Sequence, residues 1–410
     1  MSPPPQDMPD FARIGWVRPL IATLAIQAAA SFLNRLTAAI APALSIHFDI
    51  RETFIGYFGA VTTAGSMLFL LIGAPLIRRY GPILVLQIGL LFGAGSLLLM
   101  LLPHWMFIVF ASFAIGLGYG PSAQAANEVL QQTAPPRHRN LIFSIKQAGV
   151  PIGGVMAGLA LPPLVDAFGW QSTIFFSIVV VTLTVIGVEP LRARIDSMRD
   201  PNHPAGLRAI LSIESLVSPV VALRENKAAM RLALTGALFA STHGVWIAFI
   251  VTYAVSGLQM SLARGGLLLA LSQGTGIFGR LVLGYLADRM GSGVPALALI
   301  AVTSATATIL LGLTDASWPF WLILLFVIAA GLMVSSWNGL VLSEIGRHSP
   351  RGRAAESFAG ANLLLFVGYL TAPPLFAVMV DHFGYRTSFI LLGLLTLTAL
   401  WPLAQLWRSR

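Results

Sequence analysis

Long apolar stretches separated by short polar segments run along the whole chain. A stretch of about 20 apolar residues is long enough to cross a lipid bilayer as a helix. Charged residues, Pro, Gly and His bound these stretches and predict twelve membrane helices. We expect the helices over residues 17–45, 52–77, 83–102, 105–131, 141–165, 171–188, 230–256, 263–286, 294–313, 318–343, 355–380 and 387–406. The pattern predicts an all-α membrane protein.

One polar interruption is much longer than the others and divides six helices from six. We expect a cytoplasmic N-terminal tail at 1–16, a six-helix bundle at 17–188, a cytoplasmic linker at 189–229, a second six-helix bundle at 230–406 and a cytoplasmic tail at 407–410. Residues 207–223 of the linker form either a short amphipathic helix on the membrane face or an unstructured segment.

The charge distribution explains the net charge of +9, which at first suggests a nucleic-acid partner. Of the 25 Lys and Arg residues, 19 lie in the tails, the linker and the loops on the same side of the membrane as the tails. The opposite loops hold only Arg51, Arg264 and Arg386. An excess of cations marks the cytoplasmic side, so we expect both termini there, in a bacterial inner membrane, and no nucleic-acid partner.

Composition excludes several other classes of protein. Hydrophobic residues make up 56% of the chain and charged residues 10%, against about 25% charged in soluble domains. The chain has no Cys, which excludes thiol catalysis, thiolate metal sites and disulfides. It also lacks the HExxH, GxSxG and P-loop motifs. We therefore expect neither an enzyme nor a bound metal or cofactor.

The chain matches itself at offsets of 210 to 215 residues, about half its length. The matched pairs, in chain order, are 50–56 with 260–266, 74–81 with 284–291, 136–139 with 350–353, and 162–170 with 373–385. Two parallel six-helix repeats with a site between them are the arrangement of major facilitator transporters. With this repeat the whole chain resembles the major facilitator superfamily. The resemblance implies twelve helices in two pseudo-symmetric bundles that move a substrate by alternating access.

The most specific motif of this resemblance is Gly284-Tyr-Leu-Ala-Asp-Arg-Met-Gly291, which is similar to the family's G-x-L-a-D-R-x-G signature. In the first half, Ala74 replaces the leading Gly and Arg78 the acidic residue. The resemblance implies gates on the cytoplasmic side. The residues expected there are Asp288, Arg289, Gly284, Gly291, Arg78, Arg79 and Gly81, with Glu128 and Glu344 as gate or packing ion pairs.

Two further motifs bear on the direction of transport. Gly149, Gly153 and Gly158 resemble the fifth-helix motif of family antiporters, but small residues four apart also serve close helix packing. Proton-coupled exporters carry an Arg in helix four where this chain has Ser112. Its absence weakens a drug-export function.

Three cations fall inside apolar helices, where a charge is costly and usually faces a cavity, a partner or a substrate. Arg35 lies about 15 Å and Arg280 about 12 Å from the helix ends, at 1.5 Å per residue. Arg35 with Asn34 resembles the first helix of organic-anion carriers, and Gly279-Arg280 the eighth helix of monocarboxylate and oxalate carriers. The resemblance implies that both arginines bind substrate. Lys146 is shallower and serves either substrate or helix packing.

Neutral polar residues at similar depth complete the expected pocket or form hydrogen bonds between helices. With the three cations, the predicted substrate-binding residues are Arg35, Arg280, Lys146, Asn34, His243, Gln273, Trp337 and Asn338. No Asp or Glu offsets the cations at this depth, and guanidinium groups bind carboxylates through two parallel hydrogen bonds. We therefore expect a secondary transporter of a small carboxylate-like anion, acting as a monomer. The alternative is an exporter of amphipathic compounds by proton antiport.

The sequence leaves the energy source open. His243 is the histidine placed in mid-span and titrates near neutral pH in water, so it is one candidate proton carrier. Counter-transport of a second anion and entry of a proton on the substrate itself are the other routes. We expect that no carboxylate of the protein carries the proton.

Overall fold

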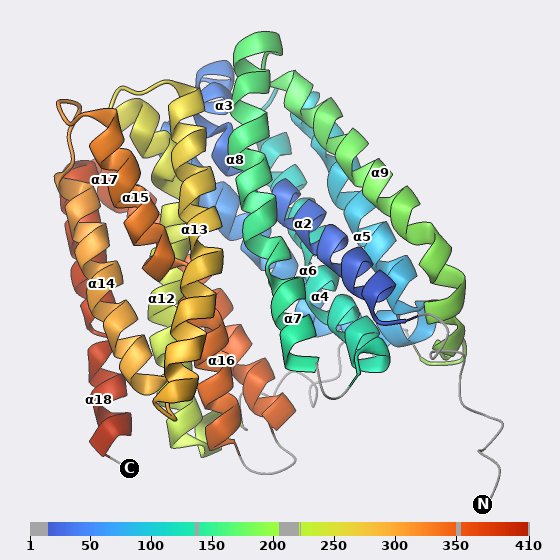
Figure 1. Cartoon of the computed structure of the whole chain (residues 1–410). Coiled ribbons are helices and arrows are strands. Elements are labelled where there is room, and N and C mark those ends of the chain that lie inside the picture. The colour runs from blue at the N-terminus through green and yellow to red at the C-terminus, as the bar shows by residue number, and fades with distance from the viewer. Residues whose placement is uncertain (1–14, 136–138, 205–220, 222, 350–353, 409–410) are drawn as a thin grey trace, which may run out of the picture.

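The computed structural model describes residues 15–135, 139–204, 221, 223–349 and 354–408. The matched segments 136–138 and 350–353, most of the proposed linker helix and residues 1–14 lie outside the described residues. Regular structure in the described part is helical. Both ends of the described chain lie at the same end of the bundle, the lower one in Figure 1, which we call the proximal end; the opposite end is the distal end.

The N-terminal half, residues 17–198, forms six crossings. Its helices are α2 (Val17–Ala39), α3 (Ala41–Phe48), η1 (Glu52–Phe54), α4 (Ile55–Tyr80), α5 (Pro82–Ser96), η2 (Leu97–Leu101), α6 (Met106–Thr133), α7 (Arg139–Gln147), α8 (Gly149–Phe168), α9 (Gln171–Ile195) and η4 (Asp196–Met198). Helix α9 continues seven residues beyond the predicted end at 188.

The C-terminal half, residues 227–408, forms the other six. Its helices are α12 (Lys227–Thr252), the π-helical turn η5 (Tyr253–Gly257), α13 (Leu262–Arg289), α14 (Val294–Leu313), α15 (Phe320–Val334), α16 (Trp337–His348), α17 (Ala354–Leu397) and α18 (Leu400–Arg408).

The number of crossings agrees with the sequence pattern. Eleven helical runs among the described residues are long and apolar enough to span a membrane. The last of them, Ser357–Arg408, contains Gly384 at φ 72° and ψ 170°, which interrupts the helix and separates the eleventh crossing from the twelfth. The predicted all-α membrane fold is confirmed.

At least three predicted helices are broken in the structure, and the fifth is interrupted at Ala148, between α7 and α8. The first ends at Ile40 (φ −116°, ψ 12°), two residues before Pro42, whose missing N–H removes a helix hydrogen bond. The tenth breaks at Ser335 and Ser336, between α15 and α16. A Cβ atom at Gly279 would lie 1.9 Å from the carbonyl oxygen of Leu332, so a glycine lets α13 pack directly against this break.

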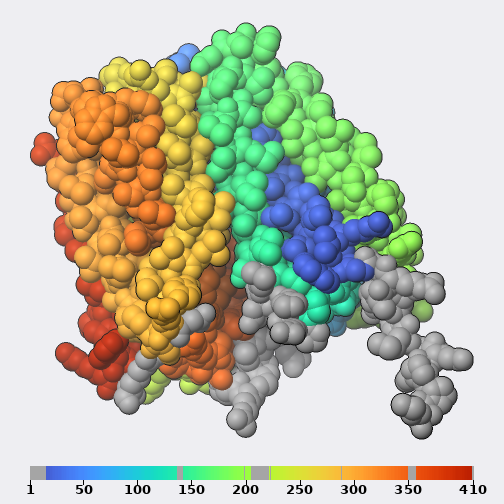
Figure 2. All heavy atoms as spheres, in the orientation of Figure 1, coloured from blue at the N-terminus to red at the C-terminus, as the bar shows by residue number. Residues whose placement is uncertain are grey.

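The two halves meet most extensively where α8 packs on α13 and α4 on α17, and Figure 1 shows α8 and α13 side by side. Glycines permit both contacts. A Cβ at Gly158 would lie 2.4 Å from the Gly266 carbonyl oxygen, and one at Gly56 would lie 2.4 Å from that of Pro373. In Figure 2 the green surface of the N-terminal half meets the yellow surface of the C-terminal half in the upper part of the view.

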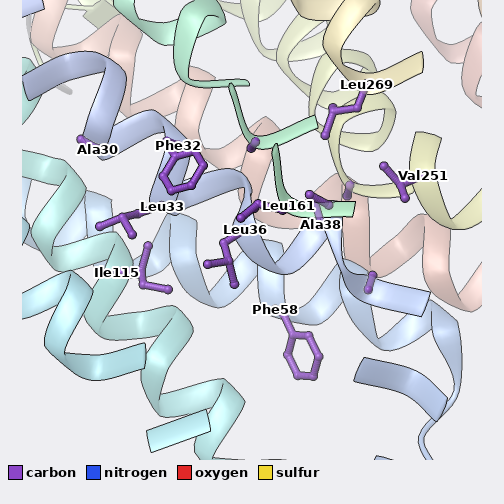
Figure 3. Close-up of a cluster of buried hydrophobic side chains, with 14 of the residues drawn as sticks. Ala30, Phe32, Leu33, Leu36, Ala38, Phe58, Ile115, Leu161, Val251 and Leu269 are labelled. Carbon is purple, nitrogen blue, oxygen red and sulfur yellow. The ribbon is translucent and has the colours of Figure 1, made fainter. Parts of the chain in front are cut away.

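A buried apolar cluster continues across this junction. Leu36, Phe58 and Leu161 from the N-terminal half and Val251 and Leu269 from the C-terminal half belong to it (Figure 3). Inside a bilayer such side chains hold helices together through close van der Waals packing, because lipid tails are as apolar as the side chains themselves.

Candidate functional site

Arg35 and Arg280, far apart in the sequence, come together at the centre of the molecule. Arg35 lies on α2 and Arg280 on α13, so the two halves supply one arginine each. The two guanidinium groups are close enough to interact electrostatically. Neither side chain is fully buried. That the two arginines bind substrate stays a prediction.

Local structure orients each guanidinium group. Arg280 Nε donates to the Ser335 carbonyl at 3.0 Å, and that carbonyl is available because the helix breaks there. Arg35 Nη1 donates to Asn34 Oδ1 at 2.5 Å. Arg35 Nε has no hydrogen-bond partner among the described residues. Asn34 thus holds the arginine that was predicted to bind substrate.

Two tyrosines that the sequence reasoning missed stand with the arginines. Tyr119 of α6 and Tyr369 of α17 each interact electrostatically with Arg35 and with Arg280. Gln27 Nε2 lies 3.4 Å from the Tyr119 hydroxyl oxygen, to which it donates. The sequence could have indicated them, because each is a tyrosine near the middle of an apolar membrane helix.

His243 links three elements of the C-terminal half. Its Nδ1 lies 2.9 Å from the Tyr369 hydroxyl, and its Nε2 lies 3.3 Å from Ser335 Oγ. The His243 and Tyr369 rings are 6.0 Å apart. The indole of Trp337 lies 6.4 Å from the Tyr369 ring, and its Nε1 is buried without an acceptor among the described residues. We call His243, Tyr369 and Trp337 the aromatic wall.

The other predicted substrate residues lie around this centre. Lys146 is fully buried within the N-terminal half, where Nζ donates to the Ser122 carbonyl at 2.8 Å and to Asn127 Oδ1 at 3.4 Å. Gln273 is buried where α8 meets α13, next to Gly154. Asn338 is half-buried and follows Trp337 at the start of α16.

The predicted gating residues of the C-terminal half gather at the proximal end around the start of α14. Glu344 is buried, and its Oε1 accepts a hydrogen bond from Gly293 N at 2.8 Å. Arg347 Nη1 donates to the Gly291 carbonyl at 2.8 Å, and Gly291 has a positive φ of 64°. Nearby, the Arg289 guanidinium lies 4.8 Å from the centre of the Tyr285 ring. Gly284 lies in α13, one turn before Asp288, whose side chain is outside the described residues.

The equivalent corner of the N-terminal half is built differently. Gly81 turns the chain at φ 95°, and Asp196 caps α5 by accepting hydrogen bonds from Ile83 N and Leu84 N, both at 2.9 Å. Burial raises the pKa of the Asp196 carboxyl, while these hydrogen bonds act in the opposite direction. The Arg78 carbonyl accepts from Asp200 N at 2.9 Å. Sequence reasoning missed Asp196 because it lies in the polar linker.

Two further predicted gating residues also lie at this corner. The Arg78 side chain interacts electrostatically with Glu128 of α6. The guanidinium of Arg79 lies 5.6 Å from the centre of the Tyr80 ring.

The distal end is closed by polar contacts between the halves, which we call the distal latch. Arg51 Nη1 lies 3.1 Å from Asp381 Oδ2, and Thr53 Oγ1 donates to Asp381 Oδ1 at 2.9 Å. Glu52 accepts hydrogen bonds from Tyr385, at 2.8 Å, and from Ser256. The latch therefore comprises Arg51, Glu52, Thr53, Ser256, Asp381 and Tyr385. The predicted gating residues were all proximal, so sequence reasoning missed it.

The chain matches a known protein family and several relatives. The model of the Major Facilitator Superfamily matches residues 23–355. An uncharacterized MFS-type transporter of Mycobacterium tuberculosis is 26% identical over 287 residues, 70% of this chain and 62% of the relative. The 4-hydroxybenzoate transporter PcaK of Acinetobacter baylyi is 24% identical over 61% of this chain and 60% of the relative. The chain thus spans about three fifths of the length of these two relatives.

Longer matches come from one further relative and from solved structures. The gentisate transporter of Corynebacterium glutamicum is 24% identical over 89% of this chain and 82% of its own. A POT family transporter in complex with 5-aminolevulinic acid superposes with a TM-score of 0.75 at 15% identity, covering 95% of this chain and 94% of the other. A bacterial homologue of the human lysosomal transporter Spinster gives 0.72 at 16% identity, over 95% and 96% of the two chains. At these identities the structural likeness shows the fold alone. With the family model matched over most of its length, the chain belongs to the major facilitator superfamily.

Proposed function

We propose that the protein is a secondary transporter that carries a small organic anion across a membrane by alternating access. The observation that carries the proposal is the meeting of Arg35 and Arg280 from opposite halves. Among the described residues no carboxylate forms an ion pair with either of them. A bound anion supplies the missing negative charge and touches both halves at once.

The arginine geometry favours a carboxylate as the charged group. Arg35 keeps the edge formed by Nε and Nη2, and Arg280 keeps the edge formed by its two Nη atoms, free of partners among the described residues. Either edge offers two parallel N–H donors, the arrangement that binds a carboxylate at two points. The relatives named for 4-hydroxybenzoate and gentisate are named for carboxylates, which supports the same class.

The distal latch supports alternating access around this site. It seals one end of the molecule by contacts between the halves, and these contacts must break for a substrate to reach the arginines from that end. The distribution of Lys and Arg supports a cytoplasmic proximal end, in a bacterial inner membrane. In this conformation the arginines are then closed off from the side opposite the cytoplasm.

Transport by arginine variants tests the proposal. Purified protein in proteoliposomes is assayed for uptake of radiolabelled benzoate and lactate against an internal pool of the same anion. We expect Arg35→Gln and Arg280→Gln each to lower uptake at least about 100-fold, because each removes a charge-assisted bidentate contact worth about 3 kcal/mol.

The matched control is Arg264→Gln, which removes an exposed arginine of the distal end and should transport like the wild type. Size-exclusion profiles in detergent show that each variant is folded. Wild-type uptake by both central variants would contradict the proposal, as would a complete lack of anion uptake by the wild type.

A further inference from the structure

Aromatic residues border the anion site; Tyr369 is partly exposed, and His243 and Trp337 are buried. Tyr369 interacts with both arginines, and its ring lies 6.4 Å from Trp337 with an angle of 35° between the ring planes. His243 adds a third ring, 6.0 Å from that of Tyr369. Tyr119 stands on the N-terminal side and interacts with both arginines and with Tyr369. An anion held at the arginines therefore has one tyrosine from each half nearby.

Two of the three buried cations are available to an anion in this conformation. Lys146 donates to the Ser122 carbonyl and to Asn127, within the N-terminal half. Arg35 and Arg280 each keep one bidentate edge. These two guanidinium edges can bind a single carboxylate that they share, or the two carboxylates of a dicarboxylate. The neighbouring aromatic rings favour a monocarboxylate with a ring, because a saturated dicarboxylate has no aromatic face to pack on them.

From this arrangement we infer that the substrate is an aromatic carboxylate, and that Tyr369, backed by the buried Trp337, determines the preference for a ring. The inference rests on the proposed anion transport, since the same arginines hold the carboxylate. Aromatic rings prefer offset or edge-to-face contact at centroid distances of 4.5–7 Å, a spacing that the aromatic wall itself displays. The carboxylate binds to the arginines while the ring packs on Tyr369, which the buried Trp337 supports from behind.

Binding of three anions to the purified protein tests this inference by isothermal titration calorimetry. Benzoate has the ring and one carboxylate, cyclohexanecarboxylate has a saturated ring of similar size, and succinate has two carboxylates and no ring. We expect benzoate to bind about 3- to 10-fold more tightly than cyclohexanecarboxylate, the range that aromatic contacts typically give. Succinate should bind more weakly than benzoate.

Variants identify the residues responsible. Tyr369→Leu and Trp337→Leu should bring the ratio of the benzoate and cyclohexanecarboxylate affinities close to 1, and Tyr369→Phe, which keeps the ring, should preserve the ratio. The matched control is Phe376→Leu, which removes a buried ring whose centroid lies 4.8 Å from that of Phe389. It should also leave the ratio unchanged.

The outcomes separate this inference from the proposed function. Equal affinity for benzoate and cyclohexanecarboxylate, or tighter binding of succinate, would overturn the aromatic class while leaving anion transport standing, provided that Arg35→Gln abolishes the binding. No binding of any of the three anions to the wild type would overturn both. The wild-type comparison decides the matter even if a leucine variant fails to fold.

Discussion

At the residue scale, His243 connects a tyrosine and an arginine of the C-terminal half. It bonds to the Tyr369 hydroxyl and lies within hydrogen-bond distance of Ser335 Oγ, and Ser335 in turn holds Arg280 through its carbonyl. One histidine thus positions both a ring of the aromatic wall and an arginine. Its two nitrogens are occupied by neutral hydroxyl groups, which favours a positioning role alongside its predicted place in the substrate site.

A double-mutant cycle tests this role. His243→Ala and Tyr369→Phe should each weaken benzoate binding about 3- to 10-fold, because each removes one end of a hydrogen bond worth about 0.5–1.5 kcal/mol. Since both remove the same bond, the double variant should lose less than the sum of the two, and calorimetry would measure the difference. Strictly additive losses would show that the two side chains act independently.

The sequence predicts the position of some residues in the interior of the molecule better than that of others. Arg35 and Arg280 were predictable, because a charge deep in an apolar helix is too costly to be kept without a purpose. Tyr119 and Tyr369 were not, since a tyrosine fits an apolar helix whether its hydroxyl faces a site or a neighbouring helix. Asp196 was equally hidden, because carboxylates are common in polar linkers and its partners are backbone groups.

At the element scale, the sequence predicts the lengths of the helices but not where they break. Hydropathy predicts the crossings well, because a bilayer sets their length. The break at Ser335 depends on tertiary packing, since Gly279 brings α13 against the end of α15, and no local sequence rule marks it. This break supplies the carbonyl that orients Arg280, so an unpredicted local feature completes a predicted site.

The cap that Asp196 provides is an element-scale feature with a measurable effect. Asp196→Ala leaves the first turn of α5 without two hydrogen-bond acceptors, and loss of a helix cap typically costs about 0.5–2 kcal/mol. We expect the apparent melting temperature in detergent to fall by about 2–4 °C. The control Asp200→Ala removes an exposed carboxylate of the same segment and should change it little. Equal melting of both variants would argue against the cap.

At the scale of the whole molecule, the distal latch biases the equilibrium between conformations. Its bonds to charged groups are partly exposed and together contribute about 1–3 kcal/mol. Removing them in a Glu52→Ala, Asp381→Ala double variant should raise the population of states open at the distal end by about 5- to 150-fold. Spin labels on His104→Cys and Ala316→Cys, both exposed at the distal ends of the two halves, test this expectation. Electron spin resonance should show an additional, longer distance between the two labels.

The absence of native Cys makes such labelling specific. The control variant Glu189→Gln breaks an exposed ion pair with Arg192 within one half and should leave the distances unchanged. If the latch variant gives the same distances as the wild type, the apolar junction alone keeps the distal end closed.

The placement of one arginine on each half has a consequence for what the cell can do with this protein. Without cargo, every movement of the halves changes the distance between two like charges in a poorly screened interior, whereas a bound carboxylate offsets one of the two charges throughout the cycle. We therefore expect the return step to be slow when no cargo is bound. Net accumulation of a nutrient would then depend on a steady supply of another acid leaving the cell, so that uptake follows the rate at which metabolism produces waste.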